Sequence, residues 1–155
     1  MGNTMYFEDF EPGQVFETVG RTITETDLTT FSMLTGDWHP IHADVEYAKT
    51  TRFGERLVHG VFGIALALGM MYPLGIFEGS AVALLGITDW RFKRPIVVGN
   101  TLRMRLRILD KGPGRSGKVG RVGRWFELVN EAGDVVQAGR GDALVLARPS
   151  TGQAA

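Results

Sequence analysis

The sequence contains no cysteine among its 155 residues. Disulfide bonds and thiolate metal sites are therefore both excluded. Net charge is absent too, because 17 basic and 17 acidic side chains cancel. A neutral chain has no general attraction to a phosphate backbone, and no recognition motif accompanies its basic residues. We therefore do not expect nucleic acid as a partner.

Targeting and membrane signals are also missing. The opening residues, MGNTMYFEDFEPG, are acidic and lack the basic and apolar regions of a signal peptide, so we expect a cytoplasmic protein. Residues 60–77 carry no charge, and a membrane span is the rival interpretation of this run. A span needs about 20 mostly apolar residues, whereas Pro73 and four glycines interrupt this one. We expect a helix buried on all sides of a soluble core, and no membrane partner.

Hydrophobic residues make up 44% of the chain, enough for one buried core. We expect a single domain over residues 1–148 and a disordered tail over residues 149–155.

Charge is unevenly spread along the chain, since residues 1–50 hold nine acids and two bases, while residues 91–124 hold eleven bases and one acid. The basic segment either binds an anion or presents alternating arginines on the wet face of a strand. These arginines are Arg103, Arg105 and Arg107.

Helix signals come early in the chain. Thr24 and Asp27 match a capping box, and Gly36 has the conformational freedom that ends a helix. Between them, apolar residues recur at helical spacing: Leu28, Phe31 and Leu34. The spacing therefore predicts a short helix that delivers Asp37 at its exit. Asp44 is predicted to cap a second short helix.

After residue 77 the hydrophobic period changes to two, which indicates strands. The predicted strands cover residues 81–92, 101–108, 118–129 and 135–147, and VFETVGRTI near the start reads as another. GPGRSG matches a dinucleotide-binding pattern, but a strand rather than a helix follows it, so we interpret it as a hairpin loop. The predicted fold class is α+β, with one antiparallel sheet wrapped around a long central apolar helix.

Asp37 and His42 are candidate catalytic residues. Five residues on a helix place two side chains about 140° apart, and an odd spacing on a strand puts them on opposite faces. Pro40 removes an amide donor and holds His39 extended, so residues 37–42 are predicted to form a turn that aims both groups at one point. A carboxylate beside an imidazole can hold a water and move its protons. The spacing leaves a second interpretation open, a capped turn with a buried histidine.

His59, Gly60 and Val61 begin the apolar helix. The first amides of a helix lack internal partners, and a glycine lets a ligand oxygen approach them closely, as an oxyanion site requires. Tight packing of the helix on the sheet is the alternative reason for this glycine. Asp37, His39 and His42 offer metal-ligand atoms, but no further ligand is evident, so we expect no metal.

The segment FSMLTGDWHPIHADVEYAKTTRFGERLVHG resembles the signature of the MaoC-like, (R)-specific enoyl-CoA hydratases. The matching positions are Gly36, Asp37, Pro40, Ile41, His42, Ala48, His59 and Gly60. RPIVVGNTLRMRLRI resembles a later strand of the family, with Asn100 where an aspartate is commoner. The family's usual asparagine is His39 here, which changes a hydrogen-bonding group beside the candidate pair. The resemblance extends over roughly residues 7–145.

This resemblance implies a hot-dog fold, a homodimer and a reversible addition of water to a trans-2-enoyl thioester. Asp37 and His42 would activate the water, and the Gly60 amide would polarise the thioester carbonyl, with His59 and Val61 in the same substrate-binding segment. The carrier would be coenzyme A or acyl carrier protein, with no other cofactor, and Arg91, Lys93 and Arg94 are candidates for phosphate contacts. Two alternatives are a hot-dog acyl-CoA thioesterase and a non-catalytic acyl-CoA-binding subunit of a heteromeric dehydratase.

Overall fold

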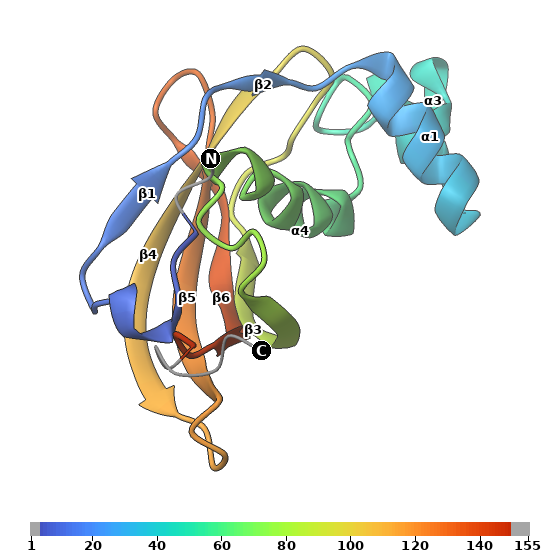
Figure 1. Cartoon of the computed structure of the whole chain (residues 1–155). Helices are drawn as coiled ribbons and strands as arrows, with labels where there is room; N and C mark the ends of the chain where they lie inside the picture. Colours follow the sequence, from blue (N-terminus) through green and yellow to red (C-terminus); the bar gives the residue numbers. More distant parts are fainter. Residues whose placement is uncertain (1–3, 150–155) are drawn as a thin grey trace.

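One antiparallel sheet forms the body of the protein in the computed structural model, which describes residues 4–149. Its long strands are β3 (Ala81–Phe92), β4 (Thr101–Pro113), β5 (Val119–Val129) and β6 (Val135–Leu146). The strand order is β1-β4-β5-β6-β3, so β1 (Val15–Glu17) and β3 lie at the two edges. Figure 1 shows this curved sheet with helix α4 (Gly60–Gly69) against its inner face. The predicted α+β hot-dog architecture is confirmed.

Strand β4 shows why the sheet has a buried and a wet face. Its apolar residues alternate with arginines along the pleat, and the two sets point to opposite sides. The core-facing residues of β4 are fully or nearly fully buried: Leu102, Met104, Leu106 and Ile108. Arg103 and Arg107 are exposed, and Arg105 pairs with Glu17 and Glu127. The arginines therefore lie on the outer, solvent-facing side of the sheet, as the strand interpretation predicts.

The central helix is shorter and less buried than its sequence predicts. Helix α4 ends at Gly69, and a separate short 3-10 helix, η2 (Tyr72–Leu74), holds Pro73 in its first turn. Proline lacks an amide hydrogen and cannot continue a helix from within. One face of α4 packs on the sheet through Gly63, Leu66 and Ala67, while Val61 is exposed. The prediction of a helix buried on all sides is therefore wrong, because the sheet covers only one face.

The amino-terminal segment also differs from prediction. VFETVGRTI was expected as one strand, but it forms two short ones, β1 and β2 (Arg21–Thr22), which pair with different parts of β4. Thr18 lies at the break, where its hydroxyl accepts a hydrogen bond from the amide of Met104. The expected GPGRSG hairpin is confirmed, since it joins β4 to β5. The predicted tail lies outside the described residues from residue 150 onward.

Three small helices form the other end of the molecule. They are α1 (Glu25–Thr35), α2 (Pro40–Ala43) and α3 (Val45–Thr50). Thr24 and Asp27 form the predicted capping box of α1, and the Asp44 carboxylate accepts hydrogen bonds from two amides at the start of α3. In Figure 1 the α1 and α3 helices lie beyond one end of α4, away from the sheet. This is the end of α4 at which Gly60 lies, since His42 of α2 stacks on His59, the residue directly before Gly60.

Among the described residues, no helix is both long and apolar enough to cross a membrane.

Candidate active site

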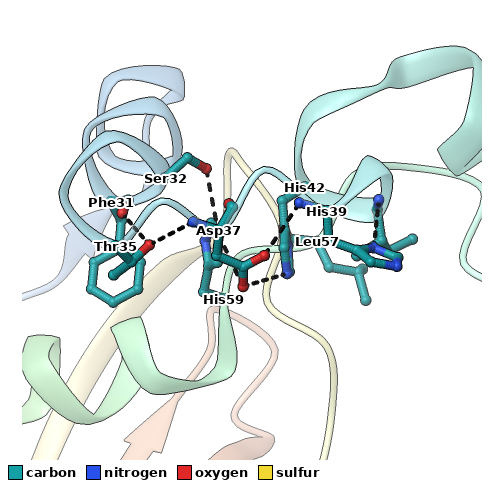
Figure 2. A network of polar contacts seen from close by, with 9 residues as sticks. Phe31, Ser32, Thr35, Asp37, His39, His42, Leu57 and His59 are labelled. Atoms are coloured by element: carbon teal, nitrogen blue, oxygen red, sulfur yellow. Dashed lines mark hydrogen bonds and ion pairs between the residues drawn. The ribbon is translucent and has the colours of Figure 1, made fainter.

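The exit of helix α1 holds Asp37 in place. Gly36 ends the helix in the left-handed conformation, with a φ of 73°. The Asp37 amide then donates to the Thr35 hydroxyl, and its carboxylate Oδ1 accepts from the His39 amide at 3.2 Å. Such a local turn fixes an aspartate side chain without regular structure around it. Its other oxygen, Oδ2, faces both His42 and His59 (Figure 2).

His42 lies on a single helical turn and not on the irregular turn that its sequence predicts. His39 has φ −52° and ψ 136°, the extended conformation that a following proline favours, and Pro40 begins α2. The His39 Nδ1 accepts a hydrogen bond from the Ile41 amide and so caps this helix. The proline therefore bends the chain as expected, and a one-turn helix then directs His42 back towards Asp37.

The tautomer of His42 follows from its hydrogen bond. Its Nδ1 lies 2.7 Å from the Leu57 carbonyl oxygen, which can only accept, so Nδ1 carries the hydrogen. Nε2 is therefore left with a free lone pair, and it lies 3.9 Å from Asp37 Oδ2. This distance is too long for a direct hydrogen bond, but a water can contact both atoms at roughly 2.8 Å each. The predicted pairing of Asp37 with His42 is present in the structure.

Leu57 connects this pair to the start of α4. The Leu57 amide donates to the Ile41 carbonyl at 3.0 Å, while the Leu57 carbonyl accepts from His42. Three residues further on, Gly60 begins the helix. Leu57 therefore makes two hydrogen bonds to α2, one through its amide and one through its carbonyl, and the chain continues from it directly into α4. These bonds fix the position of the His42 imidazole relative to the first amides of α4.

His59 packs against both members of the candidate pair, Asp37 and His42. It is 2% exposed, and its ring stacks on His42 with 3.8 Å between the ring centroids. Its Nε2 lies 3.0 Å from the Asp37 carbonyl oxygen, so Nε2 carries a hydrogen and donates it there. His59 therefore orients the backbone of Asp37, whereas its expected place was in the substrate-binding segment with Gly60. Its Nδ1 is buried with no hydrogen-bond partner among the described residues.

Burial lowers the pKa of His42 below its ordinary value of 6.5, and the nearby His59 lowers it further. The hydrogen bond to the Leu57 carbonyl and the charge of Asp37 act in the opposite direction and only partly offset this effect. The imidazole of His42 is therefore held in the neutral form, whose Nε2 is a base, to lower pH than an ordinary histidine.

The arrangement of the two stacked rings is unfavourable for a metal. Ligand atoms of Asp37, His42 and His59 lie within 4.8 Å of one another, so the cluster has the composition of a metal site. A ring nitrogen binds a metal in the plane of its ring, but the planes of His42 and His59 lie one above the other at only 24°. His39, the third ligand considered from the sequence, uses Nδ1 to cap α2. A metal in the plane of one ring would lie well outside the plane of the other.

The first amides of α4 belong to Gly60 and Val61. His59 precedes them without a side-chain cap, and no acceptor among the described residues bonds either amide outside the helix. These amides therefore present the positive end of the helix dipole to whatever lies beside them. A Cβ on Gly60 would lie 3.0 Å from the Phe92 ring, so glycine also keeps this approach open.

A pocket of about 320 Å³ joins these elements. His42 and Gly60 line it, together with Phe92 and Gln137 from the sheet. Three basic residues also line it: Arg52, Lys93 and Arg94. Lys93 and Arg94 were candidates from the sequence, whereas Arg91 does not line the pocket. The sequence interpretation missed Arg52 and Gln137, and the signal for Gln137 was a lone amide in the apolar run VVQAG.

A larger apolar cavity, of about 690 Å³, lies between α4 and the segment that holds β1 and β2. Phe31 and Phe62 line it, and the Phe31 ring also contacts His59. None of Asp37, His42 or Gly60 lines this cavity. His42 and Gly60 line the smaller pocket instead, and Asp37 reaches it through its approach to His42.

An antiparallel sheet wrapped around a central helix is the architecture of a hot-dog domain, and here a histidine and an aspartate face each other at the helix start. The family model described as "MaoC like domain" matches residues 9–127. The chain belongs to this family.

Two curated relatives illustrate the match. The protein MaoC of Klebsiella aerogenes is 39% identical over 101 residues, which cover 65% of this chain and 30% of that protein. The chain thus spans about a third of the length of that relative. The (R)-specific enoyl-CoA hydratase of Rhodospirillum rubrum is 30% identical over 146 residues, covering 92% of this chain and 93% of that protein.

Solved structures agree with the fold. The R-hydratase PhaJ1 of Pseudomonas aeruginosa superposes with a TM-score of 0.79 at 32% identity, over 94% of this chain and 88% of that one. A Mycobacterium tuberculosis protein described as having a double hotdog fold matches with a TM-score of 0.83 at 22% identity, over 97% of this chain and 46% of that one. The second likeness shows the fold alone.

Proposed function

We propose that this protein is an (R)-specific enoyl-CoA hydratase, a hydro-lyase that adds water reversibly to a trans-2-enoyl thioester. The observation that carries the proposal is the 3.9 Å separation of Asp37 Oδ2 and the bare Nε2 of His42, fixed beside the first amides of α4. The family membership and the similarity to proteins named as hydratases support it.

The proposed reaction starts with a water held between Asp37 and His42. His42 Nε2 takes a proton from this water while its oxygen bonds to C3 of the enoyl group. The electron pair of the C2–C3 double bond moves onto the thioester carbonyl, where the Gly60 and Val61 amides stabilise the developing oxyanion. The proton then passes from the pair to C2, which gives the 3-hydroxyacyl thioester. The reaction needs no metal or redox cofactor, and coenzyme A enters as part of the substrate.

The acid limb of the rate profile is expected to reflect the lowered pKa of His42. Because the reaction uses neutral His42 as the base, kcat/KM should fall only when the pH drops below 6.5, through the lowered pKa. Measuring kcat/KM for crotonyl-CoA from pH 5 to pH 8 tests this, with enzyme stability checked at each pH. An acid limb centred above pH 6.5 would contradict the role of His42.

We propose that the cations that line the pocket bind the anionic phosphates of coenzyme A. Replacing Arg52 and Lys93 together with alanine is expected to raise KM for crotonyl-CoA on the order of tenfold, with kcat little changed. Crotonyl-pantetheine, which lacks the nucleotide phosphates, is the matched control, and its KM should not change. A similar rise in KM for both substrates would mean that these residues do not bind phosphate.

We further propose that the protein works as a homodimer. Strand β3 pairs with β6 on one side and has no strand partner on the other among the described residues. Several of its apolar side chains are exposed: Val82, Leu84, Leu85 and Phe92. A long edge strand of this kind is a template for pairing with another chain, and a second copy offers the same strand.

Turnover on a panel of trans-2-enoyl-CoA esters tests the proposed function. The expected result is loss of the conjugated enoyl absorbance without release of free thiol. Release of thiol without hydration would instead identify a thioesterase. Tight binding of acyl-CoA without either reaction would indicate a non-catalytic subunit. Both of these outcomes would contradict the proposal.

A further inference from the structure

Gln137 is a buried amide that the proposed reaction does not yet use. It lies on β6 with 2% of its surface exposed, and it lines the same pocket as His42 and Gly60. A buried amide is costly unless its polar atoms are hydrogen-bonded, so its partners indicate what it does.

The two partners of Gln137 fix its orientation. Its Nε2 donates to the Gly60 carbonyl oxygen at 3.1 Å, and its Oε1 accepts from the Trp90 indole Nε1 at 3.0 Å. An indole nitrogen can only donate and a carbonyl can only accept. The oxygen and nitrogen ends of this amide therefore cannot be exchanged without losing both bonds.

The backbone around Gln137 is shaped to admit it. A Cβ on Gly63 of α4 would lie 2.4 Å from both Nε2 and Oε1 of Gln137, so only glycine leaves room there. On the other side, β3 has an irregularity between Thr88 and Arg91, where Asp89 adopts a φ of 53°. This bulge places Trp90 against Gly139, where a Cβ would lie 2.4 Å from the indole ring. Three separate features thus direct one amide to one carbonyl.

The carbonyl that Gln137 binds belongs to the first peptide of α4. The Gly60 carbonyl and the Val61 N–H lie in one planar trans peptide and point in opposite directions. Holding the carbonyl therefore fixes the direction of the Val61 N–H and the position of the Gly60 Cα. A donor on the carbonyl also polarises the same peptide, which strengthens its N–H as a donor.

We propose that Gln137 is a positioning residue for the oxyanion site, acting through the Gly60 peptide, with Trp90 holding its amide in the donating orientation. This inference rests on the proposed hydratase function. Gln137 itself need not touch the substrate, because its effect passes to the thioester through the helix start.

Three variants test the role of Gln137. Gln137→Leu keeps the approximate size and removes both polar atoms, and it is expected to lower kcat about tenfold with a smaller change in KM. Gln137→Glu keeps the shape, but its carboxylate has no hydrogen to donate to the Gly60 carbonyl. Its kcat relative to wild type should be lowest at high pH and rise as the pH falls, because a protonated carboxyl donates again. Gly63→Ala leaves Gln137 chemically intact but displaces it, and should also lower kcat.

A spectroscopic readout separates positioning from a purely structural role. A conjugated dienoyl-CoA absorbs at longer wavelength when its carbonyl is polarised, so the wild type should shift its absorbance on binding. The shift should be smaller in Gln137→Leu and Gly63→Ala, with thermal unfolding showing that both variants are folded.

The possible outcomes are distinct. If the wild type neither hydrates enoyl-CoA nor shifts the dienoyl absorbance, the proposed function fails and this inference fails with it. If the wild type does both and folded Gln137 variants match it in kcat, pH profile and shift, only the role of Gln137 is overturned.

Discussion

Gly60→Pro is expected to lower kcat about 100- to 1,000-fold relative to Gly60→Ala. Proline removes the Gly60 N–H, which is the proposed donor to the thioester oxygen. The helix itself should persist, because proline suits the first helical position and His59 already has φ −56° and ψ 133°, as the residue before a proline requires.

Gly60→Ala is the matched control. Both variants add a Cβ about 3.0 Å from the exposed Phe92 ring, so any effect of that contact is common to the two. Only the proline variant loses the amide hydrogen. Equal kcat values for the two variants would show that the Gly60 amide does not stabilise the transition state, and the oxyanion site would then have to lie elsewhere.

Asp37→Asn and His42→Ala are each expected to lower kcat about 1,000-fold. Asparagine keeps the turn contact with the His39 amide but lacks the carboxylate charge that holds the water, whereas alanine at position 42 removes the base. Because the two groups act on one water, the double variant should lose little more than either single variant. The measurement is steady-state kinetics with crotonyl-CoA on variants shown to be folded.

His39→Asn is the control for these two variants. The His39 ring centroid lies 6.3 Å from that of His42, and its hydrogen bond caps α2. Asparagine is a strong helix cap and the usual residue of the family at this position, so this variant should keep most of the activity.

The double variant has a contradicting outcome of its own. If the losses in kcat of the two single variants multiply in the Asp37 and His42 double variant, the two residues act in separate steps.

Local patterns predicted much of the site because local chemistry determines it. The capping box, Gly36 and Pro40 act within a few residues of Asp37 and His42, and each takes the expected place. The period-two alternation of β4 likewise predicted its buried face. The error over the apolar run has a local cause as well, since Gly69 and Pro73 divide it, although its composition suggested one long helix.

Contacts between distant segments could not be predicted in this way. Gln137 and Gly60 are 77 residues apart, and His42 and Leu57 are 15 apart, so only the folded sheet and the helix start bring them together. His59 was placed correctly at the helix start, but its stacking on His42 depends on where α2 returns in space. Arg52 reaches the pocket for the same reason.

Chiral analysis of the product from a trans-2-enoyl-CoA ester tests the central claim most directly. We predict that the wild-type protein converts crotonyl-CoA or a longer trans-2-enoyl-CoA to the (R)-3-hydroxyacyl-CoA. The same equilibrium mixture should form when the reaction starts from the (R)-3-hydroxyacyl-CoA. Formation of the (S)-product would contradict the proposed (R)-specificity. No conversion of any enoyl-CoA by the folded protein would contradict the proposed hydratase chemistry as a whole.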